Sequence, residues 1–304
     1  MPHADFVNLH ADDGSLAVLA PKLGGWLLRY ARPIPGHGLV EALHFEQAVV
    51  DRYPREMYAG NPVLFPIVGP NHLPGRDHAY EWEGRAFELP QHGFARRSQW
   101  TVVAQATDSV TVELCDTEAT RACYPFAFRH TLAFRLNAGR LQCEQVVENR
   151  SAVPMPFAAG FHPYFRVPLS AKSRREDCFV VIPECRRMKP IGKFERFASE
   201  PFPEQNWSVA ADVAGTLYLG GLARRELVLV DPGASLEVVL NWEDAPQHRF
   251  AALWAKDTDT PFYCLEPWTA LANAFTRRGD GELIVLEPGR TFRAAFYIEV
   301  RPMA

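Results

Sequence analysis

Short turn-forming sequences recur between apolar segments along much of the chain. Four of them contain residues that tolerate or preset turn geometry: Thr107-Asp108-Ser109, Asn137-Ala138-Gly139, Asp231-Pro232-Gly233 and Glu287-Pro288-Gly289. They lie among segments with strand signals, at 100–105, 110–114, 128–136, 141–148, 227–230, 236–240, 282–286 and 291–300. Because a tight turn brings the chain back beside itself, the segments on either side are expected to form antiparallel hairpins, and the sheet is predicted to be mainly antiparallel.

One segment indicates which side of the sheet is buried. Leu132, Phe134 and Leu136 alternate with Arg135 and Asn137, as in a sheet that is wet on one face. Such a sheet must pack its apolar face against another layer, so the chain is predicted to be all-β. Only 43–50 and 270–275 are candidates for short helices, and the proline-rich stretch 183–203 is expected to be a long surface loop. With no convincing linker, residues 1–304 are predicted to form a single domain.

Composition argues against several classes of protein. Hydrophobic residues make up 47% of the 304 residues and charged residues 22%, which allows a large core without disulfides or metal. The formal net charge is -4 and the basic residues are scattered in pairs, so nucleic acid is not expected as a partner. The chain shows no export signal and no apolar run near the roughly 18 residues of a membrane helix, so a cytoplasmic protein without membrane contact is expected. The six cysteines have irregular spacings, as in reduced, mostly buried thiols.

Three segments place ionisable groups in apolar surroundings constrained by proline or glycine: 91–96, 160–165 and 264–268. In the second, Pro163 restricts His162 to an extended backbone, and Gly160 permits the close approach of another chain or a ligand. The flanking aromatic residues form an apolar wall. The imidazole of His162 is therefore expected to be held in one direction.

The third segment contains a candidate general base. Pro267 fixes the backbone of Glu266, and Phe262, Leu265 and Trp268 provide low-dielectric surroundings that raise the pKa of a carboxyl group toward neutrality. Trp268 also offers a flat face to the C–H surface of a sugar, whose hydroxyls would meet polar neighbours. An aromatic ring beside a carboxylate suits carbohydrate chemistry.

Residue types alone leave other interpretations open. A histidine or a Pro-Trp pair in any one of these segments is more often structural than functional. Two histidines and a glutamate also describe a site for iron or another transition metal, although the residues are not as closely spaced here as is usual for such a site. A glycoside hydrolase normally needs two carboxylates about 5 to 10 Å apart, and only Glu266 lies in a convincing segment.

The motifs, taken in order, resemble those of one family. The chain is similar to the aldose 1-epimerase (mutarotase) family through Gly60-Asn61-Pro62-Val63-Leu64-Phe65-Pro66-Ile67-Val68-Gly69, His92-Gly93-Phe94-Ala95-Arg96 with Trp100, Phe161-His162-Pro163-Tyr164-Phe165 and Glu266-Pro267-Trp268. The match extends from about Leu16 to the last strand. The resemblance implies a large antiparallel β-sandwich of the galactose mutarotase type, which binds a small sugar in a cleft on one concave sheet and needs neither a metal nor another cofactor.

The resemblance also implies roles for individual residues. Glu266 would take the proton of the anomeric hydroxyl while His162 donates one to the ring oxygen, which opens the ring to an aldehyde. His92 would hydrogen-bond the sugar near the ring oxygen, Arg96 would orient that region, and Trp268 would contact the sugar. The implied activity is that of an isomerase that interconverts the α and β anomers of a hexose.

In two places the chain departs from the family pattern. It has Pro70-Asn71 where relatives commonly carry a substrate-binding arginine, so any bond made by that arginine is lost or replaced. The family aspartate that grips distant sugar hydroxyls has only Asp212 as a candidate.

Two alternatives to a free hexose follow from the same resemblance. Arg55, Arg76, Arg96 and Arg97 could supply the arginine cluster of a hexose 6-phosphate epimerase, provided that at least two guanidinium groups converge on one phosphate. The loss at Pro70 raises the other alternative, a non-catalytic sugar-binding or regulatory protein with the same fold.

Overall fold

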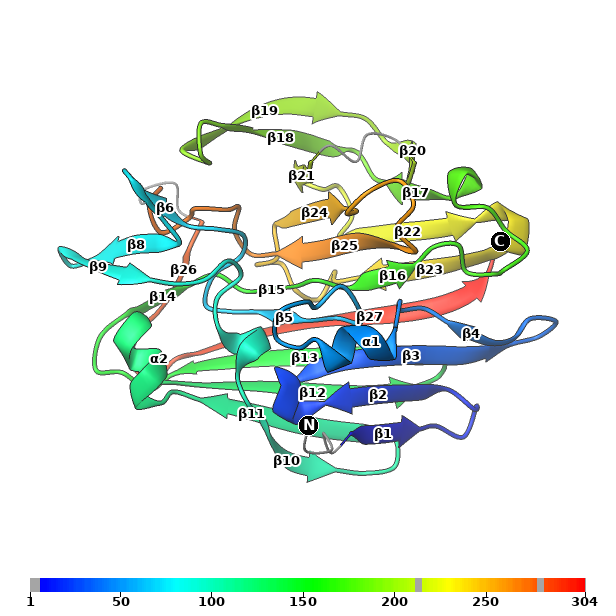
Figure 1. Cartoon of the computed structure of the whole chain (residues 1–304), viewed down its shortest axis with the longest axis horizontal. Coiled ribbons are helices and arrows are strands. Elements are labelled where there is room, and N and C mark those ends of the chain that lie inside the picture. The colour runs from blue at the N-terminus through cyan, green and yellow to red at the C-terminus, as the bar shows by residue number, and fades with distance from the viewer. Residues whose placement is uncertain (1–5, 211–214, 278–281, 304) are drawn as a thin grey trace.

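Two large antiparallel sheets dominate the computed structural model, which describes residues 6–210, 215–277 and 282–303 (Figure 1). The first large sheet has the strand order β10-β11-β12-β13-β27-β23-β22-β17-β20 among the described residues. Its strands are β10 Thr101–Gln105, β11 Ser109–Cys115, β12 Phe128–Asn137, β13 Arg140–Asn149, β27 Thr291–Pro302, β23 Leu236–Asn241, β22 Glu226–Asp231, β17 Phe179–Ile182 and β20 Gln205–Ser208. β27, drawn in red in Figure 1, lies between β13 and β23 and pairs with both.

The second large sheet positions the candidate site. Its strand order is β19-β18-β21-β24-β25-β15-β5, and β16 also pairs with β25. The strands are β19 Arg196–Phe202, β18 Cys185–Ile191, β21 Leu217–Gly220, β24 Phe250–Trp254, β25 Phe262–Trp268, β15 Gly160–Phe161, β5 Val63–Leu64 and β16 Tyr164–Arg166. Every residue of β25 is buried, as expected for a strand covered on both faces.

Smaller elements flank these sheets. A four-stranded sheet consists of β1 Val7–His10, β2 Leu16–Ala20, β3 Trp26–Ile34 and β4 Gly38–Glu41. Three strand pairs follow: β6 His72–Leu73 with β7 Arg76–Asp77, β8 Ala79–Trp82 with β9 Arg85–Glu88, and β14 Met155–Phe157 with β26 Ile284–Leu286. The helices are α1 Gln47–Asp51 and α2 Glu118–Cys123, with 3-10 turns at Pro21–Leu23, Ala95–Arg97, Arg175–Asp177 and Pro232–Ala234. Among the described residues, no helix has the length and apolar character needed to cross a bilayer.

The two large sheets share a core between their inner faces. In β12, alternate residues from Phe128 to Leu136, His130 among them, are buried, while the residues between them are half-buried or exposed. Across the core, the rings of Phe161 on β15 and Phe296 on β27 have centroids 4.5 Å apart. Burying one such side chain contributes about 1.5–3 kcal/mol, so many of them hold the layers together. The predicted all-β antiparallel sandwich is confirmed.

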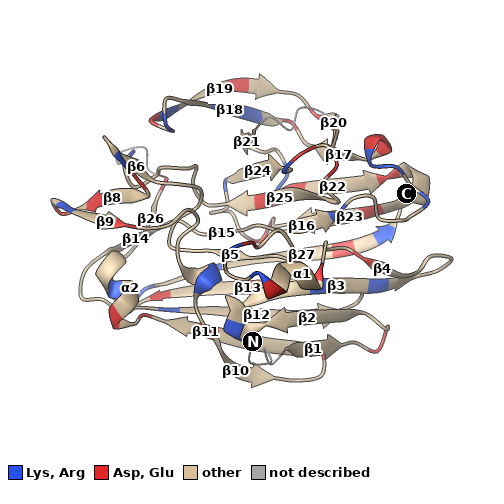
Figure 2. Cartoon of the chain, viewed as in Figure 1, with Lys and Arg blue, Asp and Glu red and all other residues tan. Residues whose placement is uncertain are grey.

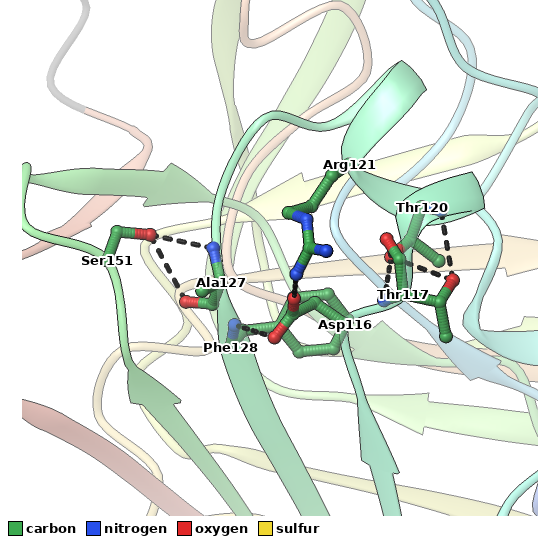
Figure 3. A network of polar contacts seen from close by, with 7 residues as sticks. All are labelled: Asp116, Thr117, Thr120, Arg121, Ala127, Phe128 and Ser151. Atoms are coloured by element: carbon green, nitrogen blue, oxygen red, sulfur yellow. Dashed lines mark hydrogen bonds and ion pairs between the residues drawn. The ribbon is translucent and has the colours of Figure 1, made fainter.

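The helix α2, which the sequence pattern did not predict, is stabilised mainly at its start. The Thr117 side chain accepts a hydrogen bond from the Thr120 backbone N–H, and Thr120 Oγ1 accepts one from the Thr117 N–H at 2.7 Å (Figure 3). This reciprocal capping box satisfies amide groups that a helix start otherwise leaves unpaired. Asp116, just before it, accepts from the Phe128 N–H at 3.0 Å and so fixes the helix against the start of β12.

Three of the four predicted hairpin turns are confirmed. The turns after β10, β12 and β22 each join adjacent antiparallel partners. The fourth prediction is wrong: Glu287-Pro288-Gly289 does not close a hairpin, because β26 pairs with β14 and β27 pairs with β13 and β23. Here partners from distant parts of the chain outcompete the neighbouring strand.

The expectation of a long loop at 183–203 is also wrong, because β18 and β19 form an antiparallel hairpin at the edge of the second sheet. It lies at the top of Figure 1. Pro190 lies beyond Arg186–Met188, the part of β18 that pairs with β21, and Pro201 lies on the edge strand. A missing N–H is tolerated at such positions because no further strand needs it.

Neither predicted helix forms as expected. Within 43–50, a helix begins only at Gln47, as α1. Residues 270–275 form turns instead, and Asn273 has a φ of 63°, which a right-handed helix does not allow.

Lys and Arg alternate with Asp and Glu along many of the described strands and turns and do not gather on one element (Figure 2). All six cysteines are free; Cys143, Cys178, Cys185 and Cys264 are buried and the other two are half-buried, as predicted.

Candidate active site

A cavity of about 310 Å³ lies on the second large sheet and brings together the three predicted segments. Its lining residues are Tyr58, Gly69, Pro70, Gln91, His92, Arg96, His162, Tyr164, Thr216, Tyr218, Trp254, Glu266 and Trp268. Five of the six predicted site residues are therefore in one cavity. Asp212 lies outside the described residues.

His162 and Glu266 form the closest ionisable pair in this cavity. His162 Nε2 is 3.4 Å from Glu266 Oε2, and the two residues are 6% and 2% exposed. Glu266 belongs to β25, while His162 follows β15 and is fixed through its backbone N–H by the Pro62 carbonyl at 3.0 Å and by Asn61 Oδ1 at 3.1 Å. Groups 104 residues apart in the chain are thus held side by side, Glu266 by β25 and His162 by the hydrogen bonds of its backbone.

Burial shifts the proton affinities of this pair in opposite directions. It raises the pKa of the Glu266 carboxyl well above its usual range, against the opposing effects of the Trp268 indole N–H and the charge of Arg96. Burial and then the charge of Arg96 lower the pKa of His162 to about 3. Burial thus disfavours the charged form of both the carboxyl group and the imidazole.

His92 is oriented as a hydrogen-bond donor toward the cavity. Its Nδ1 accepts a hydrogen bond from the Gly69 N–H at 3.1 Å, and burial lowers its pKa well below the usual range. A neutral imidazole that accepts at Nδ1 carries its proton on Nε2. The His92 and His162 rings have centroids 5.3 Å apart.

Gly93 explains how His92 reaches this position. Its φ is 72°, and a Cβ there would lie 2.2 Å from the Phe65 carbonyl oxygen. The amides of Phe94 and Ala95 donate to that same oxygen, so the segment 92–95 packs tightly against Phe65. Only glycine combines this backbone conformation with so close an approach.

Arg96 contributes a positive charge to the cavity. Its side chain is half-buried, its Nε has no hydrogen-bond partner among the described residues, and a long bond joins Nη2 to the Gln91 carbonyl at 3.3 Å. Burial and the nearby Arg97 lower the pKa of Arg96 to about 10, so it stays charged at neutral pH. Its guanidinium can therefore bind a polar ligand.

Aromatic side chains form the walls of the cavity. A Cβ on Gly160 would lie 2.7 Å from Trp268 Cδ1, which confirms that this glycine permits close approach, in this case of Trp268. The Trp268 indole N–H lies near enough to Glu266 to lower the pKa of its carboxyl, but it makes no hydrogen bond of ordinary geometry among the described residues. The rings of His162 and Tyr164 stack in parallel, with centroids 4.6 Å apart and an interplanar angle of 5°. This stacking fixes the plane of the imidazole.

Pro70 also lines the cavity, at the position where the resemblance implies a lost arginine. Among the four arginines proposed as a phosphate cluster, only Arg96 is a lining residue, and Arg76 pairs with Glu88 at 3.2 Å.

Sequence reasoning missed several residues of the cavity. Tyr58, Tyr218 and Trp254 look like ordinary core or strand residues in the sequence, and no motif marked them. Asn61 and Tyr164 do lie in the family-like motifs, so their position beside other motif residues was the one signal that could have identified them.

The alternative chemistries are tested by the same geometry. Among the described residues, Glu266 is the one carboxylate that lines the cavity, so the second carboxylate of a glycoside hydrolase is not found there. The metal-binding alternative predicted a set of two histidines and a glutamate. The described residues that bring three donor atoms within 4.8 Å of one another are instead His162, Cys264 and Glu266.

A larger hollow of about 590 Å³ lies on strands of the first large sheet, lined among others by Arg135, Glu144, Arg293 and Tyr297. It contains none of the predicted site residues. The smaller cavity is the better candidate because buried ionisable groups with shifted pKa values converge there.

Comparisons with known proteins identify the family and the fold. A family model described as aldose 1-epimerase matches residues 10–298. The chromosomal protein LacX of Lactococcus lactis subsp. lactis is 26% identical over 227 residues, which is 70% of this chain and 74% of LacX.

Two solved structures have the same fold. A galactose mutarotase related enzyme from Lactobacillus acidophilus has a TM-score of 0.78 at 23% identity and covers 98% of both chains. A galactose mutarotase-like protein from Clostridium acetobutylicum has a TM-score of 0.83 at 20% identity and covers 98% of this chain and 95% of its own. The chain belongs to the aldose 1-epimerase family.

Proposed function

We propose that this protein is an aldose 1-epimerase that interconverts the α and β anomers of a hexose, with Glu266 as general base and His162 as general acid. The observation that carries the proposal is the distance of 3.4 Å between His162 Nε2 and Glu266 Oε2 inside a sugar-sized cavity. One group can thus reach the anomeric hydroxyl while the other reaches the adjacent ring oxygen.

The proposed reaction moves two protons and consumes none. The Glu266 carboxylate takes the proton of the anomeric hydroxyl, the C1–O5 bond breaks with its electron pair on O5, and the His162 imidazolium protonates O5. A carbonyl forms at C1. After rotation about the C1–C2 bond, the same transfers in reverse close the ring on the other face of the carbonyl and restore both groups.

The pKa shifts support this assignment. Because burial raises the pKa of Glu266, its carboxylate is a stronger base than an exposed one. Because burial and Arg96 lower the pKa of His162, its imidazolium is a stronger acid. The carboxylate–imidazolium form of the pair is the one that opens the ring, and burial disfavours that form relative to the neutral pair.

The surrounding residues would bind and orient the sugar. The Nε2–H of His92, which lies 3.2 Å from the side-chain amide of Gln91, would donate to an oxygen near the anomeric centre, where negative charge develops. Trp268 contributes both a ring face and an indole N–H that makes no hydrogen bond of ordinary geometry among the described residues. Arg96 is the cationic donor nearest to the pair, and its charge acts on both Glu266 and His162.

The test is magnetisation-transfer NMR or polarimetry on α-glucose, α-galactose and their 6-phosphates. We expect exchange of at least one free hexose well above the buffer rate, because only one arginine of the suggested phosphate cluster lines the cavity. Exchange of the 6-phosphates alone would overturn the free-hexose proposal. Binding without exchange of any of these sugars would instead identify a sugar-binding protein on this fold.

A further inference from the structure

A third donor atom lies beside the proposed catalytic pair. Cys264 is two residues before Glu266 on β25, and alternate residues of a strand face the same side. The Cys264 thiol, the His162 ring and the Glu266 carboxylate each offer one donor atom, and these three atoms lie within 4.8 Å of one another. The chemistry proposed above uses the histidine and the glutamate but gives the thiol no role.

We propose that His162, Cys264 and Glu266 form an inhibitory binding site for a thiophilic divalent cation of the Zn²⁺ type. Sulfur, imidazole nitrogen and carboxylate oxygen are all Zn²⁺ ligands, and a thiolate with an imidazole favours Zn²⁺ over Mg²⁺ or Ca²⁺. Three protein ligands leave one tetrahedral position for water from the cavity.

The spacing of the pair fits such a site. Two ligands bonded to one tetrahedral Zn²⁺ at about 2.0–2.1 Å lie about 3.4 Å from each other. The His162 Nε2 to Glu266 Oε2 distance is 3.4 Å, which is long for a charge-assisted hydrogen bond. The two atoms can therefore share a metal ion with little movement of their strands.

Unpaired polar atoms at the same place point to a missing ligand. Glu266 Oε2 and His162 Nδ1 are buried and make no hydrogen bond among the described residues, although Glu266 Oε2 lies 3.4 Å from His162 Nε2. Buried polar atoms are rarely left unpaired, because each one has lost its water without replacement. A cation bound by Glu266 Oε2 and His162 Nε2 would pair the first of these atoms directly.

The cation would inhibit anomer exchange because it binds through the same lone pairs of Glu266 and His162 that the reaction uses. An ion on Glu266 and His162 removes the general base and blocks the nitrogen that carries the acid proton. Binding would release the Cys264 thiol proton to solvent and involve no redox change. The inhibitory effect rests on the proposed function, but the metal site itself does not.

The test uses the full chain and three variants: Cys264→Ala, Cys264→Ser and the control Cys185→Ala, which removes a buried thiol outside the cavity. Zn²⁺ binding is measured by calorimetry. Co²⁺, which takes the same ligands, reports a bound thiolate through its charge-transfer absorption. Anomer exchange is measured with and without Zn²⁺, and again after addition of EDTA.

We expect one Zn²⁺ per chain, a cobalt–thiolate absorption, and a loss of exchange that more sugar or EDTA reverses. Both Cys264 variants should keep their basal exchange but bind Zn²⁺ roughly tenfold or more weakly and lack the cobalt–thiolate band, because one of three protein ligands is gone. Cys185→Ala should behave like the unmodified protein.

Unchanged Zn²⁺ affinity in folded Cys264→Ser, or no cobalt–thiolate band in the unmodified protein, would overturn the proposal. A protein that binds Co²⁺ through Cys264 but exchanges no sugar would keep the metal site and lose the proposed function. A protein that exchanges sugar but does not bind Co²⁺ through Cys264 would keep the proposed function and lose the metal site, so the two failures are distinguishable.

Discussion

The backbone N–H of Asn273 donates a hydrogen bond to the carbonyl oxygen of Pro70, 2.8 Å away. The Asn273 side chain accepts from the His72 N–H at 2.8 Å and donates to the Phe194 carbonyl at 3.3 Å. Asn273 thereby joins the cavity wall at Pro70 to the turn between β18 and β19. Its φ of 63° is tolerated by asparagine and glycine better than by other residues.

Replacing Asn273 by Gly should raise KM more than it lowers kcat. Glycine keeps the backbone bond to Pro70 but removes the side-chain bonds to His72 and Phe194, so the segment next to Pro70 loses its fixed position while the His162–Glu266 pair is untouched. Steady-state kinetics of anomer exchange measure both constants, and urea unfolding should show a loss of about 1–3 kcal/mol. Equal falls in kcat and kcat/KM with unchanged KM would contradict this positioning role.

Replacing Glu266 by Gln should lower the anomer exchange rate roughly 10²–10⁴-fold, because the amide keeps the shape but cannot accept the proton. Sugar affinity, measured by calorimetry, should change little. The matched control is Glu83→Gln, an exposed glutamate away from the cavity. Full exchange in folded Glu266→Gln would remove Glu266 as the base.

Gly93→Ala should both destabilise the protein and reduce exchange, because the new Cβ would overlap the Phe65 carbonyl and displace His92. The matched control is Gly84→Ala, where φ is also positive, at 75°, but no atom lies within 4 Å of the added Cβ. The control should lose only about 1–2 kcal/mol of stability, from the backbone strain of alanine at a positive φ, and its exchange should be unchanged. Thermal or urea unfolding of both variants separates strain from overlap, and equal losses would show that the overlap does not matter.

Acid should destabilise the protein partly through His248. This residue is 2% exposed, neither ring nitrogen has a partner among the described residues, and burial lowers its pKa from 6.5 to about 3. Between these values the unfolded chain binds more protons than the folded one, so stability rises with pH from about 3 to 6.5 and is lost as the pH falls through that window.

His248→Phe should remove this dependence, because a phenyl ring suits the neighbouring Phe161 and Phe292 and does not titrate. Its gain in unfolding free energy over the unmodified protein should be about 2 kcal/mol larger at pH 5 than at pH 7.5. Urea unfolding at both pH values measures the difference, with the exposed His37→Gln as control. An equal gain at both pH values would show that His248 does not titrate in this range.

The features that the sequence predicted well were local. Turns such as Asn137-Ala138-Gly139 identify the strands beside them because partner and turn are adjacent. Glu287-Pro288-Gly289 misled because the partners of β27 come from residues 140–148 and 236–241, which no local pattern reveals. Prolines in 183–203 suggested a loop, yet an edge hairpin accommodates them.

In the candidate site, too, residues marked by local patterns could be predicted and residues placed by distant segments could not. His92, His162 and Glu266 could be identified because proline, glycine and aromatic neighbours mark them and the family motifs contain them. Asn273 and Cys264 could not, because in the sequence they resemble a turn asparagine and a core cysteine. Their importance arises from what other segments place beside them.

The position of β27 affects how the chain can fold. The first large sheet has two halves, β10 to β13 and β23 to β20, and among the described strands β27 alone hydrogen-bonds to both. Residues 291–302 would leave the ribosome only after the rest of the sheet is made. The two halves therefore cannot be joined by the hydrogen bonds of β27 during most of synthesis. Until then the unpaired edges of both halves would be open to pairing with other strands.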